Sequence, residues 1–477
     1  VDGEVLEGSS FVDESMISGE PIHVEKKPGE KIYAGTINQK GSFRFKAKKV
    51  GKDTLLAQII KTVDEAQGSK APVQGLVDKI AGIFVPVVIG IALLSFVIWL
   101  IFGGETGFVY GLMAMVTVLV IACPCALGLA TPTAIMVAIG KGAEEGILIK
   151  DAESLEMAKE IDVVVLDKTG TITEGKPQVT SITWSKNSLP IHRDILYSIE
   201  HQSEHPLADA ITNELKENST LLENVSVEQV SGKGIEGTYE NIVYYIGNEQ
   251  YITSKDITIP ADLQDKINEE LNAAHTISII ADDNEAYGVV GITDKLKSTS
   301  KEAISTLKDM GIEVAIYTGD NEKVAAALSG ELGVTNFKGG VLPEEKANLV
   351  KILQQQGKKV AMVGDGINDS GALAQADVSI AMGAGSDIAM DVAKMTIISS
   401  DLKKIPKAIH LSRATVRTIR QNLFWAFIYN VIGIPIAAGV LYPFIGFMLN
   451  PMIAGAAMAL SSVSVVTNSL RLKTKKI

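Results

Sequence analysis

The sequence has almost no cysteine and no excess of positive charge. Its only two cysteines, Cys123 and Cys125, stand two positions apart, which makes them a poor candidate for a structural disulfide. The disulfide framework of small secreted proteins is therefore excluded. The net charge of −12 gives no support to nucleic-acid binding, so no nucleic-acid partner is expected.

Charge is also absent from three long stretches, although 21% of all residues are charged. Residues 80–102 suffice for one spanning helix of about 20 residues. Residues 106–140 exceed one straight span, and Pro124 and Pro132 predict a kinked or broken helix there. Residues 421–470 are interrupted near the middle by YPFIGFMLNP, which predicts two helices. Four membrane spans are thus predicted, at about 80–102, 108–138, 421–441 and 449–470.

Lysine and arginine are missing from the two short connections between paired spans, residues 103–107 and 441–451. The opposite ends of the same spans are basic. Basic flanks face the cytoplasm in most membrane proteins. The large segment from about 141 to 420 is therefore predicted to be cytoplasmic, together with both ends of this chain.

Three short sequence segments in that part of the chain, called phrases below, each begin with an apolar, β-branched run and end in a polar motif. Apolar runs of this kind are typical of buried parallel strands. Motifs that directly follow such strands gather at the carboxyl edge of one sheet, where open α/β folds bind ligands. The phrases are VVVLDKTGT (163–171), VAIYTGDN (314–321) and VAMVGDGIND (360–369).

The side chains at this predicted edge fit phosphoryl transfer. Asp167 stands at a strand end, available as a nucleophile toward a γ-phosphate. Asp365 and Asp369 offer the hard oxygen ligands that Mg²⁺ prefers. Lys168 and Lys346 can neutralise charge on the transferring group. Further polar groups of the same motifs are Thr169, Thr318, Gly319 and Asp320. One such motif would fit a helix-capping loop equally well, but three in this order do not.

DKTGT, TGD and GDGIND in this order resemble the P-type ATPases, whose core belongs to the haloacid-dehalogenase superfamily. The resemblance implies that ATP phosphorylates Asp167, with Mg²⁺ held by Asp167, Thr169, Asp365 and Asp369. Soluble phosphatases of the superfamily, the alternative enzyme class, usually carry a second Asp two positions after the nucleophile. Here that position is Thr169, which implies a phosphoenzyme that persists until another domain brings in water.

Residues from about 178 to 290 separate the first of these strand-and-motif segments from the second. Their polar composition predicts a separate domain. SEHPLA (203–208), followed by GKG (232–234), resembles the nucleotide-binding motif of the heavy-metal branch of the family. The resemblance implies that Glu200 and His205 contact the adenine region of ATP. The other positions that it assigns to the nucleotide are Gly232, Gly234 and, more weakly, Asn248.

DESMISGEPIHVEK (13–26) resembles the TGE loop of the actuator domain of these ATPases. The resemblance implies that Glu20 positions and activates the water that hydrolyses the aspartyl phosphate. Ser18 replaces the usual Thr, which leaves the carboxylate in place.

Pro124 separates the two cysteines in the middle of a predicted span. Residues two apart point about 200° apart on a straight helix. Pro124 lacks an N–H and disfavours helical geometry at Cys123, so local unwinding lets both sulfurs reach one ion. Thiolates favour soft ions such as Cu(I), Zn(II) and Cd(II).

The last two spans favour copper among the soft ions. Met458 and Ser462 lie four apart on one helix face, and a thioether suits Cu(I). Together with the Cys pair, Tyr429 and Asn430, they resemble the Cu(I) subgroup of the family. The zinc and cadmium subgroup, the alternative, typically adds a membrane Lys and Asp, and these spans contain no charge.

The resemblance runs over essentially the whole chain and implies a multidomain membrane protein. An α-helical transmembrane bundle would accompany a cytoplasmic α/β haloacid-dehalogenase-like domain, its α+β nucleotide-binding insert and a partial β-rich actuator domain. The expected boundaries are 1–70 for the actuator part, 71–140 for two spans, 141–177 with 291–400 for phosphorylation, 178–290 for nucleotide binding, and 401–477 for the last spans.

The implied function is ATP-driven transport of Cu⁺, and of silver, out of the cytoplasm across a bacterial plasma membrane. The expected partners are membrane lipid, copper delivered by a chaperone, and an N-terminal part of the same protein that this chain lacks. Gly371 replaces a proline of the family's motif, which predicts a looser loop start. The alternative from a different class of function is that the chain is an inactive fragment or one that only binds its ligands.

Overall fold

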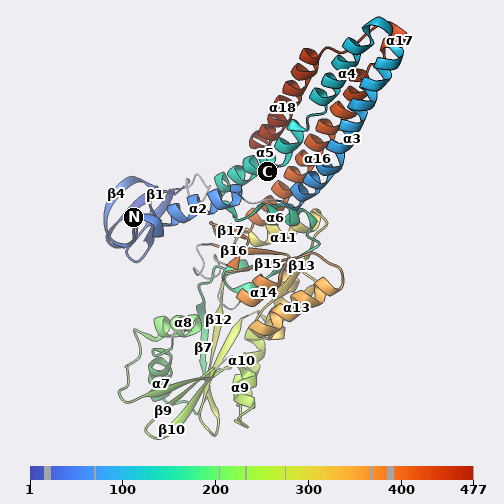
Figure 1. Ribbon diagram of the computed structural model, residues 1–477. Coiled ribbons are helices and arrows are strands. Elements are labelled where there is room, and N and C mark those ends of the chain that lie inside the picture. Colours follow the sequence, from blue (N-terminus) through green and yellow to red (C-terminus); the bar gives the residue numbers. More distant parts are fainter. Residues whose placement is uncertain are drawn as a thin grey trace. The chain divides into compact units, whose positions relative to one another are not determined.

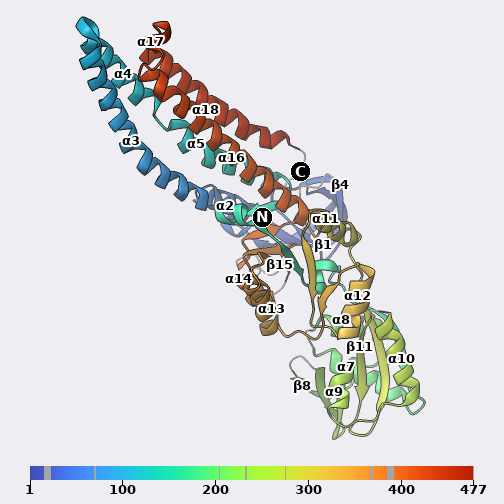
Figure 2. The same ribbon diagram turned by 90° about the vertical axis from the view of Figure 1, so that its right-hand side faces the viewer.

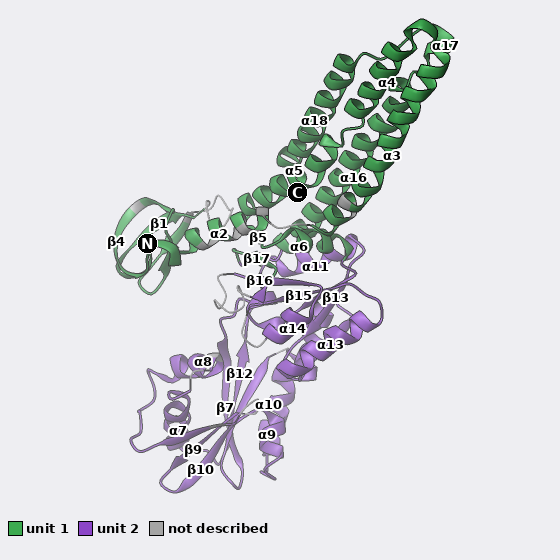
Figure 3. Cartoon of the chain, in the orientation of Figure 1, with its two compact units in different colours: residues 1–160, 394–399, 404–477 green, residues 161–393, 400–403 purple. Residues whose placement is uncertain are grey.

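The computed structural model describes residues 1–14, 23–68, 71–203, 205–230, 234–273, 275–365, 369–383 and 392–475. The chain forms two compact units (Figure 3). Unit 1 comprises residues 1–160, 394–399 and 404–477, and unit 2 comprises residues 161–393 and 400–403. Unit 2 is therefore inserted into the sequence of unit 1.

The N-terminal part of unit 1 is a four-stranded antiparallel sheet in which one long strand pairs with three others. The Asp2 carboxylate anchors the chain around this sheet, because it accepts hydrogen bonds from the N–H groups of Ala34 (2.8 Å) and Leu55 (2.6 Å). The prediction of a β-rich segment here is confirmed. The elements are β1 (Asp2–Asp13), β2 (His23–Lys26), β3 (Lys31–Ile32), β4 (Ile37–Lys49), η1 (Gly51–Asp53) and α2 (Leu55–Gly68).

Long helices form the rest of unit 1 and run side by side in Figures 1 and 2. Helix α3 packs on α4, while α5 packs on α16 and α18. These elements are α3 (Pro72–Phe102), η2 (Gly104–Thr106), α4 (Gly107–Ile121), α5 (Cys125–Glu144), α16 (Lys404–Ala437), α17 (Tyr442–Ile445) and α18 (Pro451–Thr474).

Three helical stretches in the described part of the chain are long and apolar enough to cross a membrane. They are Pro72–Phe102, Gly104–Glu144 and Pro451–Thr474, and they overlap three of the four predicted spans. The fourth predicted span, 421–441, falls mainly on α16, which ends at Ala437 and is not among the three. That span remains a prediction.

The predicted break at Pro124 is present. Helix α4 ends at Ile121, and α5 begins at Cys125 with Pro124 as its N-cap. Pro124 has no N–H to donate to the preceding turn, so the helical ladder stops there. The Pro124 carbonyl accepts from the N–H of Leu127 at 3.0 Å and so begins the next helix.

A buried polar network joins three of these helices. The Asn422 amide of α16 donates to the Ala130 carbonyl of α5 (3.3 Å) and to the Ser469 hydroxyl of α18 (2.9 Å). The Asn468 amide donates to the Asn422 side-chain oxygen at 2.8 Å. Because a polar group in apolar surroundings is costly unless it is paired, this network fixes how the three helices pack.

Short elements link the helices of unit 1 to the chain of unit 2. Strands β5 and β17 pair antiparallel, and the Asp151 carboxylate caps α6 by accepting from the Ser154 N–H at 2.6 Å. The first half of α16 packs on α6 and η3. These elements are β5 (Ile147–Ile149), α6 (Ala152–Met157), η3 (Ala158–Glu160) and β17 (Met395–Ile397).

Unit 2 contains five parallel strands in the order β14-β13-β6-β15-β16. All four residues of VVVL in β6 are buried, which confirms the predicted parallel strand. The strands are β6 (Val163–Leu166), β13 (Glu313–Tyr317), β14 (Asn336–Lys338), β15 (Val360–Gly364) and β16 (Val378–Met382). The associated helices are η4 (Lys168–Ile172), α11 (Ser300–Asp309), α12 (Glu322–Glu331), α13 (Pro343–Gln355) and α14 (Ser370–Gln375).

The insert is a six-stranded antiparallel sheet in the order β7-β12-β11-β10-β9-β8 (Figure 1). Helices cover both of its faces, since α7 and α8 belong to one buried apolar cluster and α9 and α10 to another. The strands are β7 (Gln178–Trp184), β8 (Ser226–Val230), β9 (Gly234–Tyr239), β10 (Ile242–Gly247), β11 (Thr276–Ala281) and β12 (Ala286–Thr293). The helices are α7 (Pro190–Glu200), α8 (Pro206–Leu215), α9 (Glu249–Thr253) and α10 (Ala261–Asn272).

Candidate active site

Three carboxylates meet at the carboxyl edge of the parallel sheet. In the sheet register Leu166 lies beside Ile316 on one side and Val363 on the other. The residues that follow these strands therefore leave the sheet together. One oxygen each of the carboxylates lies within 4.8 Å of the others, and the three residues are Asp167, Asp365 and Asp369.

Lys346 lies between two of these carboxylates. It belongs to α13, is 5% exposed, and donates to Asp167 and, at 2.8 Å, to Asp369. Burial acts to lower the pKa of the ammonium, but the charges of Asp167 and Asp369 and their hydrogen bonds outweigh it, so the pKa is raised. Lys346 therefore remains a cation beside the predicted nucleophile.

The carboxyl groups of the other two aspartates resist ionisation. Burial, followed by the negative charge of Asp167, raises the pKa of Asp369 to about 7. The same two causes raise the pKa of Asp365 to about 6. Because crowded, buried carboxylates ionise more readily beside a divalent cation, this set of hard oxygen donors fits Mg²⁺.

The TGD motif holds the other predicted lysine. Lys168 forms an ion pair with Asp320. The Thr318 hydroxyl donates to Asp320 Oδ2 and accepts from the Asp320 N–H, both at 3.1 Å. Thr276 of the insert donates to Asp320 Oδ1 at 3.2 Å. Thr169 and Gly319 are both exposed at this edge. Of the predicted catalytic residues, Glu20 lies outside the described residues.

Sequence reasoning missed Lys297 and Asp294 beside the site. Lys297 donates to the Gly170 carbonyl, and burial lowers its pKa to about 8 against the opposing charges of Asp365 and Asp294. Thr173 Oγ1 lies 2.6 Å from Asp294 Oδ2 and accepts from the Gly170 N–H at 3.2 Å. The signal was available: TDKLK (293–297) follows an apolar run, as the three predicted motifs do.

The predicted nucleotide-binding residues do not all lie on one face of the insert. Glu200 ends α7, is buried, and has a pKa raised by burial to about 7. His205 precedes α8, where its Nδ1 accepts from the Leu207 N–H at 3.2 Å. Both helices belong to the apolar cluster that includes β9, where Gly234 stands first. Asn248 instead caps α9, which packs on the other face.

Two of these positions have structural reasons for their residue type. A Cβ at Gly234 would lie 2.1 Å from the Ile246 carbonyl of the paired strand. The Asn248 side chain accepts from the Tyr251 N–H at 2.8 Å and so caps a helix. Gly232 lies outside the described residues. The assignment of all five residues to the nucleotide remains a prediction.

The two cysteines are joined by a disulfide, with Cα atoms 5.5 Å apart. The expectation that they are a poor candidate for a disulfide is therefore wrong for this structure. Its physical reason is the break in the helix, because unwound backbone at Pro124 brings both sulfurs to one side. The same arrangement supports the expectation that both sulfurs can reach one ion once they are reduced.

The other predicted cargo residues occupy different environments. Met458 is buried in the apolar cluster against which Cys123 packs. Asn430 is 3% exposed, and its side-chain oxygen has no hydrogen-bond partner among the described residues. The Ser462 hydroxyl donates to the Met458 carbonyl at 3.3 Å. Tyr429 is 45% exposed on α16, and its ring centroid lies 6.2 Å from that of Trp425.

A lysine-bridged aspartate at the edge of a parallel sheet, with an inserted second domain, is the arrangement of a haloacid dehalogenase-like domain, and its side chains are suited to phosphoryl transfer. A family model for haloacid dehalogenase-like hydrolases matches residues 161–377, and a second one matches residues 346–409. The model of the P-type ATPase actuator domain matches residues 1–64.

Relatives of this chain extend the match to its full length. It is 51% identical to a copper-exporting P-type ATPase of Staphylococcus saprophyticus and 49% identical to one of Staphylococcus aureus, with 100% of the chain covered. The chain spans only 59% and 58% of these two proteins. A solved zinc-transporting PIB-type ATPase in an E2.Pi state is 32% identical, with a TM-score of 0.66, 99% of this chain and 76% of that one covered. The chain belongs to the P-type ATPase family.

The geometry around Gly170 predicts that this position accepts no side chain. Its φ is +70°, and an added Cβ would lie 1.5 Å from Asp365 Oδ2. We expect Gly170→Ala to lower the free energy of unfolding by about 1–3 kcal/mol, measured by thermal denaturation. Gly371→Ala is the matched control, because its Cβ would lie 3.9 Å from the nearest atom and inside helix α14. Equal melting temperatures for both variants would contradict this expectation.

Burial of Glu200 predicts a pH-dependent cost to stability. The folded state raises its pKa from 4.5 to about 7, so the folded state binds the proton more tightly. The associated stability is present below pH 4.5 and is lost as the pH rises through about 7. Glu200→Gln should therefore gain stability relative to wild type as the pH rises, by up to about 3 kcal/mol.

Thermal unfolding at acidic pH and above about 7 tests this expectation. Glu217→Gln is the control, since Glu217 is exposed and loses the same charge. A pH-independent difference between wild type and Glu200→Gln would refute the role assigned to burial.

Proposed function

We propose that this chain is the catalytic and ion-conducting part of an ATP-driven copper pump that forms an aspartyl phosphate. The observation that carries the proposal is the position of Asp167, which is bonded to Lys346 and lies within reach of Asp365 and Asp369. Membership of the P-type ATPases supports the same chemistry. The proposed cargo is Cu⁺, and also Ag⁺, exported from the cytoplasm across a bacterial plasma membrane.

The phosphoryl step follows from the side chains at the sheet edge. The Asp167 carboxylate attacks the γ-phosphorus of ATP, a new oxygen–phosphorus bond forms, and the bond to ADP breaks. Lys346 and Lys168 stabilise the negative charge that spreads over the phosphoryl oxygens. Asp167, Thr169, Asp365 and Asp369 would hold Mg²⁺, which supplies further charge neutralisation when bound.

We propose that the phosphoenzyme persists because the residue two positions after the nucleophile is a threonine, whose hydroxyl is not a general base. Thr169 is exposed at the position where soluble phosphatases of the superfamily usually carry an aspartate. Hydrolysis then depends on Glu20, which we propose directs water to the phosphate. The nucleotide would be held by the insert through Glu200 and His205, with backbone approach at Gly232 and Gly234 and a weaker contribution from Asn248.

Reduced Cys123 and Cys125 are the proposed soft-metal ligands. The unpartnered oxygen of Asn430 and the buried thioether of Met458 support a route through the same helices, continued by Ser462. Tyr429 completes the proposed set and would have to turn inward, since it is exposed here. Copper is favoured over zinc because a thioether suits Cu(I) and residues 421–470 carry no charge.

The names of the relatives support copper as the transported ion more strongly than zinc. The staphylococcal relatives are named for copper export, and the solved relative is named for zinc transport. Zinc or cadmium transport is therefore the alternative cargo, and a binding-only fragment is the alternative of another class. Membrane lipid, a copper chaperone and the part of the protein beyond this chain are the proposed partners.

Labelling by ATP tests the phosphoryl step. Radiolabelled γ-phosphate should appear on the wild-type protein in an acid-stable form and disappear in Asp167→Asn, because the amide cannot attack phosphorus. Asp265→Asn is the control, since Asp265 is exposed on α10 and loses the same charge. No label on the wild-type protein, or equal labelling of wild type and Asp167→Asn, would refute the proposal of a pump that forms a phosphoenzyme at Asp167.

Stimulation of ATP hydrolysis by different ions tests the cargo. In the intact protein we expect Cu(I) and Ag(I) to stimulate, and Zn(II) and Cd(II) not to. Met458→Leu should weaken Cu(I) stimulation by about tenfold, because it removes a soft ligand and keeps the volume. Met452→Leu is the matched control, since Met452 is 82% exposed on the same helix. Stimulation by Zn(II) alone would overturn the copper assignment.

A further inference from the structure

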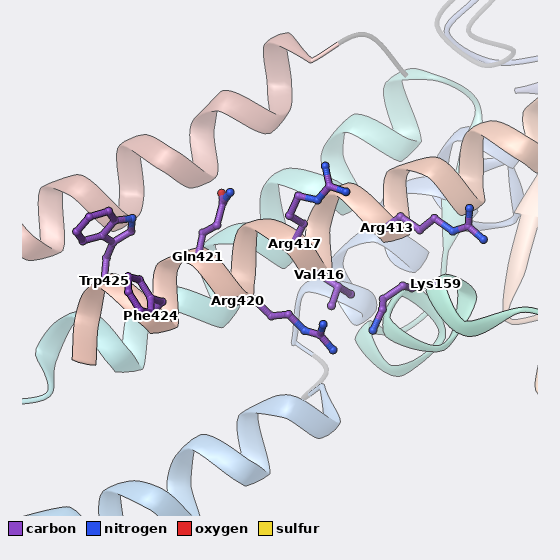
Figure 4. A pocket seen from close by; sticks show the side chains of 8 residues that line it. All are labelled: Lys159, Arg413, Val416, Arg417, Arg420, Gln421, Phe424 and Trp425. Atoms are coloured by element: carbon purple, nitrogen blue, oxygen red, sulfur yellow. The ribbon is translucent and has the colours of Figure 1, made fainter. Parts of the chain in front are cut away.

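A basic and aromatic stripe on α16 has no part in phosphoryl transfer or in the proposed ion route. Arg413, Arg417, Arg420 and Phe424 recur every three or four residues, which places them along one side of the helix. With Lys159 they line a hollow of about 540 Å³, here called the basic pocket (Figure 4).

The basic pocket presents several cations to one space. Figure 4 shows Lys159 and Arg420 reaching into the same space from η3 and α16. Arg417 and Arg420 are exposed, and neither has a carboxylate within 4.0 Å in the part of the chain that the structure describes. Lys159 has Glu160 at 3.5 Å, an exposed neighbour that compensates its charge only weakly. The pocket is thus suited to an anion.

The chemistry of the stripe changes along the helix. Its cations end at Arg420, and the uncharged stretch 421–470 begins one residue later. Phe424 and Trp425 follow within the pocket lining and are 58% and 52% exposed. Exposed aromatic rings beside outward-reaching cations are typical of the boundary between headgroups and acyl chains. An inorganic anion would make no use of these rings.

We propose that the basic pocket binds the headgroup of an anionic phospholipid in the cytoplasmic leaflet. The phosphate lies between Arg420 and Lys159, and the neighbouring Arg417 adds positive charge to the hollow, since guanidinium groups and ammonium groups bind phosphate oxygens by charge-assisted hydrogen bonds. The glycerol and the first acyl carbons lie along Phe424 and Trp425. A zwitterionic lipid brings its own cation to the pocket and is disfavoured. The inference is independent of which ion is transported.

Quenching of Trp425 by brominated lipids tests the lipid site. The intact protein carries Phe in place of its other tryptophans, Trp99 and Trp184 among them, and is reconstituted in phosphatidylcholine vesicles. A minor fraction of brominated phosphatidylglycerol should quench Trp425 more than the same fraction of brominated phosphatidylcholine. Arg417→Gln with Arg420→Gln should lower the relative binding constant for phosphatidylglycerol by roughly tenfold or more.

A second pair of substitutions separates the pocket from general surface charge. Arg471→Gln with Lys475→Gln removes the same charge from a different hollow, on α18. We expect this pair to keep the preference for phosphatidylglycerol. Equal quenching by both lipids, or an equal loss in both double variants, would overturn the proposal. Relief of quenching by inorganic phosphate would assign the pocket to free anions instead.

Folding of the variants is checked by their phosphoenzyme level, which the lipid site does not enter. If the Arg417 and Arg420 pair fails this check, Lys159→Gln alone serves as the milder variant. It should lower the preference for phosphatidylglycerol by a few-fold, and an unchanged preference would overturn the role of the pocket.

Discussion

The ion pair between Lys346 and Asp167 is the interaction on which the rest of the structure depends. The parallel sheet places three carboxylates together, and burial with mutual repulsion makes two of them resist ionisation. The ammonium groups of Lys346 and Lys297 compensate this charge only in part. A ligand that brings positive charge, or a phosphoryl group that joins the Asp167 carboxylate in a mixed anhydride, therefore changes the charge balance of the site. Such a change is what a phosphorylation-driven device requires.

Close packing around the nucleophile fixes where these charges lie. Gly170 turns the chain at positive φ, so that its backbone passes beside the Asp365 carboxylate. Lys297 reaches the Gly170 carbonyl from the strand that closes the insert, and Thr276 reaches Asp320 from the same insert. The insert thus contacts the DKTGT and TGD motifs through side chains, within one compact unit. The same contacts would therefore connect a ligand bound in the insert with the charge at Asp167.

The sequence predicts the sheet edge well because buried parallel strands leave continuous apolar runs, and the motifs directly follow them. It misses Lys297 and Asp294 because the strand that they follow, β12, belongs to the antiparallel insert and not to the parallel sheet that carries the three motifs. It also misjudges the cysteines, since spacing along a chain says little where proline unwinds the helix. Of the four spans predicted from the sequence, three coincide with helices that are apolar enough to cross a membrane. The fourth lies on α16, which is charged up to Arg420 and uncharged after it, so that one helix combines a polar and an apolar half. Gly234 is required by close strand pairing, and Asn248 caps a helix. A motif match alone cannot distinguish these structural roles from a role in ligand binding.

The order of elements along the chain limits how a change at Asp167 can reach the cysteines. Helix α5 begins at Cys125, runs for 20 residues and leads at once into β5, which pairs with β17. Strand β17 leads in turn into α16, which carries Asn430. A helix of that length extends about 30 Å and resists compression along its axis. Movement of the β5 and β17 pair would therefore act on Cys125 through α5 and on Asn430 through α16. Once the disulfide is reduced, the break at Pro124 frees Cys123 from the ladder of α5, so the two sulfurs need not move together, and their separation is the quantity that such a movement would change.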